Sequence, residues 1–374
     1  MSNLSTALKL VPSETQLPVT AYFDEALHQQ ELDLLFKPGP GYIGHTLMVP
    51  EPGDYYALPA ENEGRILVRN GSAQGNDQGD DIELLSNVCR HRQAVMLNGR
   101  GNATNIVCPL HRWTYDLKGE LLGAPHFSEQ PCLNLGRSPL QNWNGLLFDG
   151  KRDVRADLAR LGVTKDLDFS GYMLDHVEVH DCNYNWKTFI EVYLEDYHVE
   201  PFHPGLGNFV TCDDLVWEFG DWYSVQTVGL NAGLRRPGTP AYKKWHDAIM
   251  HFNRGELPKQ GAIWLTYFPN IMVEWYPNVL VVSTLHPMGP RKTRNVVEFY
   301  YPEEAVLFER EFVEAERAAY METCVEDDEI AERMDAGRAI LMARGVNEVG
   351  PYQSPMEDGM QHFHEWYRRE MRLG

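Results

Sequence analysis

The sequence has no apolar run long enough to cross a lipid bilayer, and its first residues lack the basic start and apolar core of a secretory signal. We therefore expect a cytoplasmic protein that does not enter a membrane. Positive charge is also scarce, because 33 Lys and Arg residues stand against 54 Asp and Glu residues, for a net charge of −21. Since clustered cationic side chains bind nucleic-acid phosphates, we expect no nucleic-acid partner.

Cysteine is scarce too. The chain has six cysteines in 374 residues, and a disulfide framework is not expected in a cytoplasmic protein of this size. Four of them are scattered without metal-ligand spacing. The other two each stand close to a histidine, in the pairs Cys89-x-His91 and Cys108-x2-His111. Thiolates and imidazoles are metal ligands, so these two short segments predict a metal centre.

Hydrophobic patterning divides the chain into three parts and indicates an α+β protein. Helical spacing over residues 21–36 predicts a helical N-terminal segment (1–40), which we expect to pack on the C-terminal domain. Short apolar runs separated by Gly, Asn, Asp and Pro predict an antiparallel β domain over 41–155. Residues 156–374 form the third part and the larger domain.

Within the larger domain the patterns change from strands to helices. Helical spacing over 185–198 predicts a helix that stops before Pro201. Strands are expected across 215–300, where Pro-Asn pairs interrupt apolar runs. Charged, periodic stretches predict helices over 303–345 and 357–371. The domain is therefore expected to be an antiparallel sheet flanked by helices.

Two kinds of metal centre use two cysteines and two histidines: a tetrahedral zinc ion and a [2Fe–2S] cluster. Zinc sites usually pair Cys with Cys and His with His, whereas each pair here mixes the two, which favours the cluster. The pattern Cys89-x-His91-x16-Cys108-x2-His111 resembles the Rieske iron–sulfur motif. The resemblance implies that the two cysteines bind one iron and the two histidines the other. Arg112 departs from it, because oxygenase versions most often have Gly after the second His.

A second group of candidate ligands lies between Glu195 and His203. Glu195 and His198 are three residues apart on one helical face, and His203 follows Pro201, where the predicted helix ends. Two imidazoles and one carboxylate form the facial triad of mononuclear non-heme Fe(II) oxygenases, which leaves coordination positions open for O2. By spacing alone, Glu195 is one candidate for the carboxylate.

The acid-x2-His-x4-His pattern of this segment resembles the catalytic domain of Rieske non-heme iron oxygenases, the α subunits of the aromatic ring-hydroxylating dioxygenase family. The resemblance covers roughly residues 40–370 and implies a helix-grip-like catalytic domain. It also implies that Glu195 bridges His198 and the partner subunit's His111 and couples electron transfer between subunits. Most members have Asp there, so Glu195 is a departure. The third iron ligand is implied to be Asp327, chosen over the adjacent Asp328.

The resemblance implies a terminal oxygenase with a Rieske [2Fe–2S] cluster and a mononuclear Fe(II), in a homotrimer. No Gly-rich flavin or nicotinamide motif is present, so NAD(P)H would act through a separate reductase, with or without a ferredoxin. A different class stays open, namely a Rieske electron-transfer protein without oxygenase activity. It would bind two irons per chain rather than three.

The substrate is expected to be a small organic molecule. Aromatic residues are frequent across 215–276, where they could line a pocket for an aromatic ring or form a cation–π cage. We favour an aromatic or aromatic-acid substrate, which implies a role in aromatic hydrocarbon catabolism by mono- or dioxygenation. The alternative is oxidative N-demethylation or hydroxylation of a betaine- or carnitine-like quaternary ammonium compound. The residues predicted to bind substrate are Trp217, Trp222, Trp264, Tyr267 and Trp275.

Overall fold

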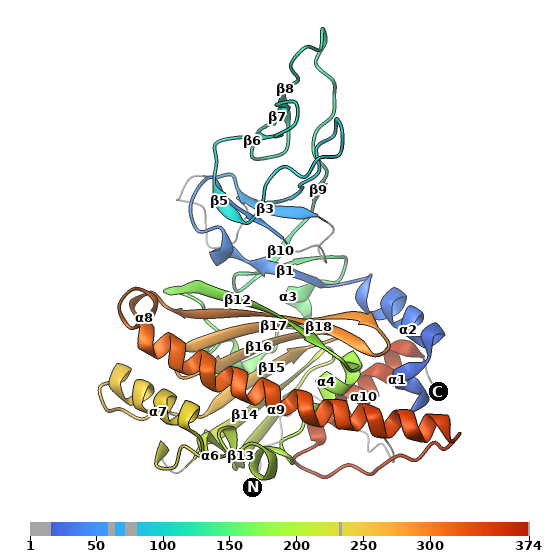
Figure 1. Ribbon diagram of the computed structural model, residues 1–374, viewed down its shortest axis with the longest axis vertical. Helices are drawn as coiled ribbons and strands as arrows, with labels where there is room; N and C mark the ends of the chain where they lie inside the picture. Colours follow the sequence, from blue (N-terminus) through green and yellow to red (C-terminus); the bar gives the residue numbers. More distant parts are fainter. Residues whose placement is uncertain (1–15, 59–63, 72–80, 232–233, 373–374) are drawn as a thin grey trace. The chain divides into compact units, whose positions relative to one another are not determined.

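The computed structural model describes residues 16–58, 64–71, 81–231 and 234–372. Contacts divide the chain into two compact units, shown in Figure 1. The smaller unit is Lys37–Ala156, and the larger unit joins the N-terminal residues up to Phe36 to the chain from Asp157 onward. In the described parts of the chain, no helix is both long enough and apolar enough to span a membrane.

The smaller unit consists of three antiparallel sheets, with strand orders β1-β11-β10, β5-β2-β3-β4-β9 and β6-β7-β8. Aliphatic residues of the central strands, such as Ile66 and Leu85, form a core that also contains Cys89, Cys108 and Trp113. The strands are β1 (Gly41–His45), β2 (Asp54–Ala57), β3 (Arg65–Arg69), β4 (Ile82–Ser86), β5 (Arg100–Asn102), β6 (Ile106–Val107), β7 (Thr114–Tyr115), β8 (Leu121–Gly123), β9 (Arg137–Ser138), β10 (Gln141–Trp143) and β11 (Leu146–Asp149).

One seven-stranded antiparallel sheet forms the framework of the larger unit. Six strands follow one another as a meander from β13 to β18, and β12 joins the free edge of β18. The strands are β12 (Tyr172–Cys182), β13 (Val210–Phe219), β14 (Tyr223–Leu230), β15 (Ala262–Tyr267), β16 (Ile271–Tyr276), β17 (Val279–Gly289) and β18 (Lys292–Pro302).

Helices of the larger unit accompany this sheet, and most are short. They are α1 (Thr20–Phe23), α2 (Glu25–Glu31), the π-helical turn η1 (Leu32–Phe36), the 3-10 turn η4 (Gly162–Lys165), α4 (Trp186–Tyr193), α5 (Val199–Phe202), α6 (Leu206–Phe209), α7 (Pro240–Phe252), α8 (Glu303–Phe308), α9 (Arg310–Ala343) and α10 (Asp358–Met371). The 3-10 turn η2 (Thr46–Met48) belongs to the smaller unit, and α3 (Val154–Asp157) lies at its C-terminal boundary.

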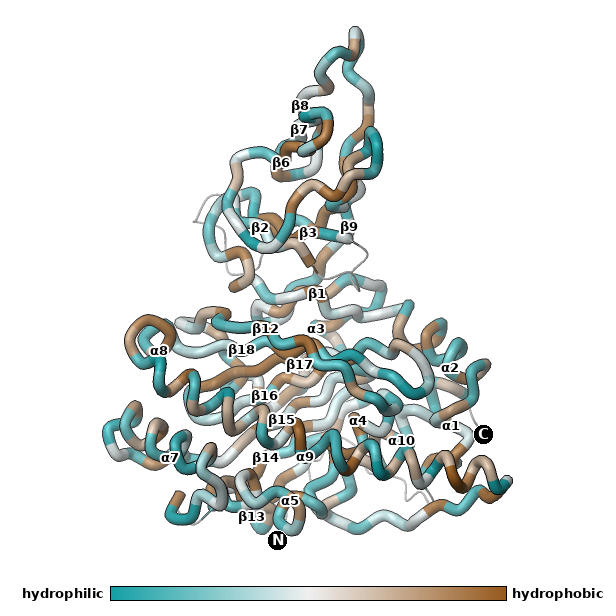
Figure 2. Tube along the Cα trace, in the orientation of Figure 1, coloured by the Kyte–Doolittle hydropathy of each residue, from teal (hydrophilic) through white to brown (hydrophobic). Residues whose placement is uncertain are grey.

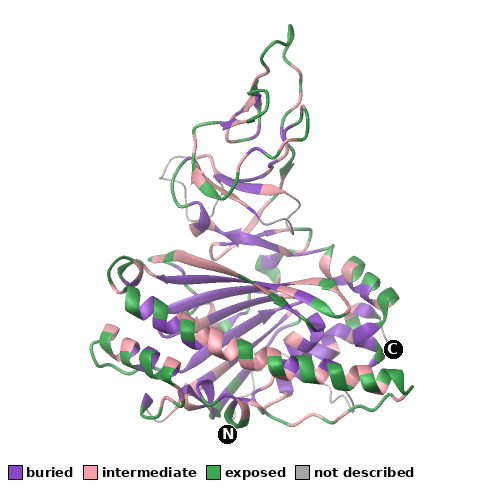
Figure 3. Ribbon diagram, viewed as in Figure 1, coloured by how far each residue is buried: buried purple, intermediate pink, exposed green. Residues whose placement is uncertain are grey.

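The long helix α9 runs across one face of the sheet (Figure 1). Its buried residues, among them Phe312 and Ala319, share a core with Phe299 of β18, and the ring of Tyr320 lies 5.1 Å from that of Phe299. Hydrophobic and hydrophilic residues alternate along α9 in Figure 2, and its outer surface is exposed in Figure 3, where the central strands β15 to β17 are largely buried. Asp327 follows Tyr320 by seven residues, or two turns, so it lies on the same side of the helix.

The predicted α+β class is confirmed, and so are the helices expected near residues 303–345 and 357–371. The helix predicted over 185–198 is shorter, because α4 ends at Tyr193 and a separate helix, α5, contains Pro201. Proline is tolerated there, since the N–H groups of a first helical turn have no intrahelical acceptor.

The region 215–300 is not made of strands alone, because α7 lies between β14 and β15. Its start is marked in the sequence by Thr239, whose hydroxyl accepts the N–H of Tyr242, and by Pro240 at the first helical position. This helix start was missed because the strand patterns on both sides of it are strong.

Candidate active site

The four predicted cluster ligands lie in two loops with the same backbone hydrogen bonding. The N–H of Gln93 donates to the carbonyl of Cys89, and the N–H of Arg112 donates to the carbonyl of Cys108, both at 3.1 Å. Gln93 and Arg112 both have positive φ, at 54° and 59°. Glycine adopts this conformation without strain, which gives a physical reason for the Gly that relatives place after the second His.

The side chains of these loops converge on one point of the smaller unit. The His91 and His111 rings have centroids 4.6 Å apart, and His91 stacks on Trp113. Both cysteines are buried and His111 is exposed. The loops therefore offer two buried sulfurs and two imidazoles, one of them at the surface.

The protonation of these groups suits metal binding. Burial raises the pKa of Cys89, but the backbone N–H of His91 and the hydroxyl of Tyr115 outweigh it and lower the pKa below its usual value. Burial and the neighbouring His111 lower the pKa of His91, and its buried Nδ1 has no hydrogen-bond partner in the described structure. Thiolates and neutral imidazoles are the forms that bind iron, so the donor set fits a Rieske cluster.

A second convergence lies in the larger unit, where the loop after α4 meets α9. His198 precedes α5 and His203 follows it, so this one-turn helix holds both imidazoles. The Oδ1 atom of Asp327 lies 3.0 Å from Nε2 of His203 and 3.4 Å from Nε2 of His198. The three side chains form a group whose ligand atoms all lie within 4.8 Å of one another.

The outer nitrogen of each imidazole meets a glutamate. The Nδ1 atom of His198 lies 2.6 Å from Oε1 of Glu195, and Nδ1 of His203 lies 2.7 Å from Oε2 of Glu326. Such partners fix the orientation of a ligand imidazole and leave Nε2 for the metal. Glu195 thus lies behind a ligand rather than among the ligands. Glu326 was missed in the sequence, although it directly precedes Asp327.

Asp328 points elsewhere. Its Oδ2 atom lies 2.6 Å from Nε2 of His180, and its Oδ1 atom accepts a hydrogen bond from the Tyr184 hydroxyl at 2.7 Å. Adjacent residues on a helix differ by about 100° in direction, so only one of two neighbouring aspartates can face the histidine pair. The structure brings Asp327 to that pair.

The histidine pair and Asp327 form a site that attracts positive charge. Burial raises the pKa of Asp327, but hydrogen bonds with His198 and His203 outweigh it and hold the pKa below its usual value. Burial lowers the pKa of His198, whereas Asp327 and Glu195 raise it to about 10. Two imidazoles that share one carboxylate fit a divalent metal ion with nitrogen and oxygen ligands.

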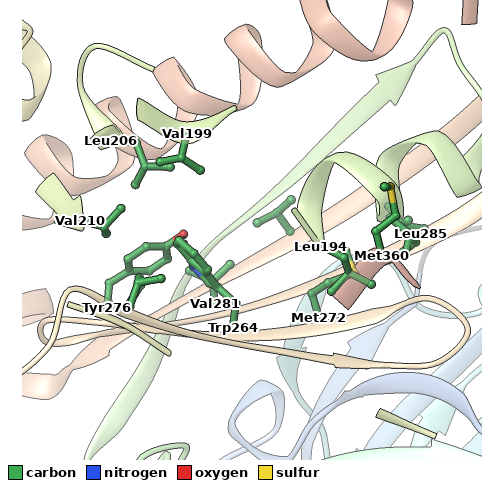
Figure 4. Packing of buried hydrophobic residues seen from close by; sticks show 14 of the residues in the cluster. Leu194, Val199, Leu206, Val210, Trp264, Met272, Tyr276, Val281, Leu285 and Met360 are labelled. Atoms are coloured by element: carbon green, nitrogen blue, oxygen red, sulfur yellow. Dashed lines mark hydrogen bonds between the residues drawn. The ribbon is translucent and has the colours of Figure 1, made fainter. Parts of the chain in front are cut away.

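A cavity opens beside this group and is lined by aromatic rings and carboxylates. His198, His203 and Asp327 form part of its wall, with Trp264 and Glu274 among the residues from the sheet. Figure 4 shows Trp264 and Tyr276 above the sheet, facing Val199 and Leu206.

Of the five residues predicted to bind substrate, only Trp264 lines this cavity. Side chains alternate between the two faces of a strand, so Tyr267 and Trp275 lie on the face opposite Trp264. Trp217 donates a hydrogen bond from Nε1 to the carbonyl of Pro355, 2.8 Å away in the segment before α10. Trp222 lies in the turn between β13 and β14 and packs against α10. The structure does not place these four residues at this cavity. Sequence alone does not reveal which face of a strand meets α9.

Comparison with known families agrees with the two groups of metal ligands described above. Residues 43–135 match the Rieske [2Fe-2S] domain, and residues 169–373 match the ring hydroxylating alpha subunit (catalytic domain). The chain belongs to the Rieske non-heme iron oxygenases. It is an oxygenase that hydroxylates a substrate, using a [2Fe–2S] cluster, a mononuclear non-heme iron and electrons from a separate reductase. The alternative of an electron-transfer protein without oxygenase activity is therefore wrong.

Among curated proteins the chain is similar to two putrescine 2-hydroxylases. The protein from Ralstonia nicotianae is 81% identical, with 99% of this chain and 100% of the relative covered. The protein from Bordetella bronchiseptica is 61% identical, with 99% and 88% covered. Neither name supports a role in aromatic hydrocarbon catabolism.

Among solved structures the chain resembles the quaternary ammonium Rieske monooxygenase CntA in complex with L-carnitine. The TM-score is 0.73 at 19% identity, with 96% of each chain covered. At this identity the likeness shows the fold alone. Members of the family work with a separate reductase and form multimers.

Proposed function

We propose that the protein hydroxylates putrescine, 1,4-diaminobutane, at C2. The observation that carries this proposal is the 81% identity, over 99% of this chain and 100% of the relative, to a protein named putrescine 2-hydroxylase. In the net reaction a C2–H bond is replaced by C2–OH. One atom of O2 enters the hydroxyl group and the other leaves as water, with two electrons from the reductase and two protons from solvent.

The chemistry of the cavity supports a cationic substrate over an aromatic acid. Glu274 and Glu316 line its wall and are buried. A substrate carboxylate would be repelled there, whereas an ammonium group would be attracted. Trp264 and Tyr276 add aromatic faces that attract cations as well.

A primary ammonium also fits better than a quaternary one. The Oε1 atom of Glu316 and the hydroxyl of Tyr193 are buried at the cavity without a hydrogen-bond partner in the described structure. A primary ammonium carries three N–H donors that can satisfy such acceptors, and a quaternary ammonium carries none.

The metal ligands keep their predicted roles in this proposal. When bound, the mononuclear iron supplies activation of O2 at its open coordination positions. The residues that hold the two centres are Cys89, His91, Cys108 and His111 for the cluster, and His198, His203 and Asp327 for the mononuclear iron.

We assign Glu195 to electron coupling between subunits of a homotrimer. Its Oε1 atom is close to His198, and its Oε2 atom accepts the N–H groups of Tyr197 and His198 at 2.7 and 3.1 Å. These bonds hold the longer Glu side chain in place, so the extra methylene does not prevent contact with the ligand histidine. Glu195 would connect it to the partner subunit's His111.

The experiment is a substrate panel with iron-loaded protein, a Rieske oxygenase reductase, NADH and ¹⁸O2. The panel contains 1,4-diaminobutane, benzoate, choline and glycine betaine. We expect only the diamine to gain one ¹⁸O atom, at C2, in proportion to NADH consumed. Hydroxylated benzoate, or an aldehyde from a quaternary ammonium compound, without diamine oxidation would overturn the proposal.

A further inference from the structure

Glu274, in the middle of the sheet, is held by two tyrosines inside the cavity. Its side chain is buried, and its Oε2 atom accepts a hydrogen bond from Tyr276 at 2.9 Å. Its Oε1 atom accepts one from Tyr320 of α9 at 3.0 Å. Trp264 in turn donates from Nε1 to the Tyr276 hydroxyl at 2.9 Å. The carboxylate is therefore fixed in position between the sheet and α9.

This buried carboxylate has no cationic partner within the described structure. No Lys or Arg there forms an ion pair with Glu274 or with Glu316, its neighbour in the cavity wall. The buried Lys187 and the partly buried Arg338 of the same unit are paired with Glu31 and Glu191 instead. Burying a carboxylate without a cationic partner is energetically costly. A buried carboxylate that is held in place at a cavity without such a partner therefore indicates a binding site for a cationic ligand.

We infer that Glu274, oriented by Tyr276 and Tyr320, binds the ammonium group of the diamine that lies farther from the oxidised carbon. This inference rests on the proposed function and adds the residue that selects the substrate. Three bonds separate C2 from that nitrogen, a span of about 3.8 Å when extended, and a charged N–H···O contact adds about 2.8 Å. C2 then lies roughly 7 Å from the carboxylate.

That reach agrees with the position of the metal ligands. Tyr320 precedes Asp327 by seven residues, which is about 10 Å along the axis of α9. Because Glu274, His198, His203 and Asp327 line the same cavity, a four-carbon chain anchored at Glu274 would reach from there toward the histidine pair. Glu274 would set both the charge and the length of the preferred substrate.

The first test replaces the charge and keeps the shape. Glu274→Gln should weaken binding of 1,4-diaminobutane by at least about 30-fold, measured by calorimetry on the iron-loaded protein without O2. The matched control is Glu298→Gln. Glu298 is also buried and accepts a hydrogen bond from a tyrosine two residues on, Tyr300, but it lies on the opposite face of the sheet from Glu274. The control should bind within about threefold of the parent protein.

The second test looks for a reversed substrate preference, which a misfolded variant cannot produce. Glu274→Asp keeps the charge but withdraws it by one methylene, so the variant should prefer 1,5-diaminopentane over 1,4-diaminobutane, the reverse of the parent. Binding by Glu274→Gln equal to the parent, in a parent that hydroxylates the diamine, would overturn the inference and leave the proposed function intact. A parent protein that neither binds nor hydroxylates the diamine would overturn both.

Discussion

The two metal-binding regions of the chain are assembled in different ways. The Rieske ligands lie between Cys89 and His111, in two loops with matching hydrogen bonds, and one imidazole is exposed. The mononuclear site takes its histidines from the loop after α4 and Asp327 from α9, with the strands β13–β18 between them in the sequence, and His203 is buried. A centre that receives electrons needs an exposed edge, whereas a centre that handles O2 and substrate needs shelter from water.

The two adjacent aspartates of α9, Asp327 and Asp328, offer the largest contrast. Asp327→Asn should remove the mononuclear iron and lower hydroxylation by more than about 100-fold. This loss is larger than that expected for a residue that only hydrogen-bonds to a metal ligand. Asp328→Asn, the matched neighbour, should keep three irons per chain and activity within about tenfold. Iron analysis with cluster absorbance measures both. Loss of the third iron from Asp328→Asn alone would reverse the assignment.

Glu326 tests whether the mononuclear site depends on support beyond its ligands. Glu326→Gln loses the charge next to Nδ1 of His203, so affinity for Fe(II) should fall by about 10–100-fold with the cluster unchanged. Competition with a chelator measures it. Glu322→Gln, one turn earlier on α9, is the control and should leave iron affinity within about twofold. Equal losses in both variants would contradict a specific role for Glu326.

The carboxylates of the cavity should make substrate affinity depend on pH, and the Rieske ligand set contains no such carboxylates. Burial raises the pKa of Glu274 to about 7, so its carboxylate is charged above that pH and neutral below it. Affinity for the diammonium form of 1,4-diaminobutane should therefore fall as pH decreases below 7, by about tenfold per unit for each proton taken up.

Glu274 does not titrate alone in this cavity. Burial also raises the pKa of Glu316 to about 8 and that of Asp196 to about 7. The slope of log affinity against pH, measured by calorimetry, should therefore be smaller in Glu274→Gln than in the parent by one proton. It should not disappear, because the other two groups still titrate. An unchanged slope would show that Glu274 does not titrate with binding.

The smallest expected effect lies in the Rieske loops. Arg112→Gly relieves the left-handed backbone strain at φ 59°, which is worth about 1 kcal/mol. The greater entropy of glycine in the unfolded chain offsets part of this gain. The free energy of unfolding of the smaller unit should therefore rise by about 0.5 kcal/mol, measured as a higher midpoint temperature for the loss of cluster absorbance. Leu110→Gly, at an exposed position without positive φ, should lower that midpoint. A lower midpoint for Arg112→Gly would contradict the strain argument.

The same contrast explains what could be predicted from the sequence. The Rieske ligands are close in sequence, so their spacing carried most of the information. The pair His198 and His203 was visible for the same reason, but Asp327 required the resemblance to a family. Glu326 and Glu274 were not predicted, because their roles depend on how α9 packs against the strands.

The aromatic residues show the remaining limit. Strand alternation divides Trp264 from Tyr267 and Trp275, but the face that meets α9 is set by tertiary packing. Composition across 215–276 was compatible with either an aromatic or a cationic substrate, and the family resemblance favoured the aromatic one. The carboxylates among those rings support the cationic one.

The central claim is that the two regions are halves of one reaction, joined between neighbouring chains through Glu195. Two inactive variants test it most directly: Cys108→Ser, which lacks the cluster, and His203→Ala, which lacks the mononuclear iron. Mixed oligomers, isolated through two different affinity tags, should recover putrescine hydroxylation that neither variant shows alone. Mixed oligomers of verified composition and iron content that remain inactive would show that electrons do not pass between chains, and would contradict the account.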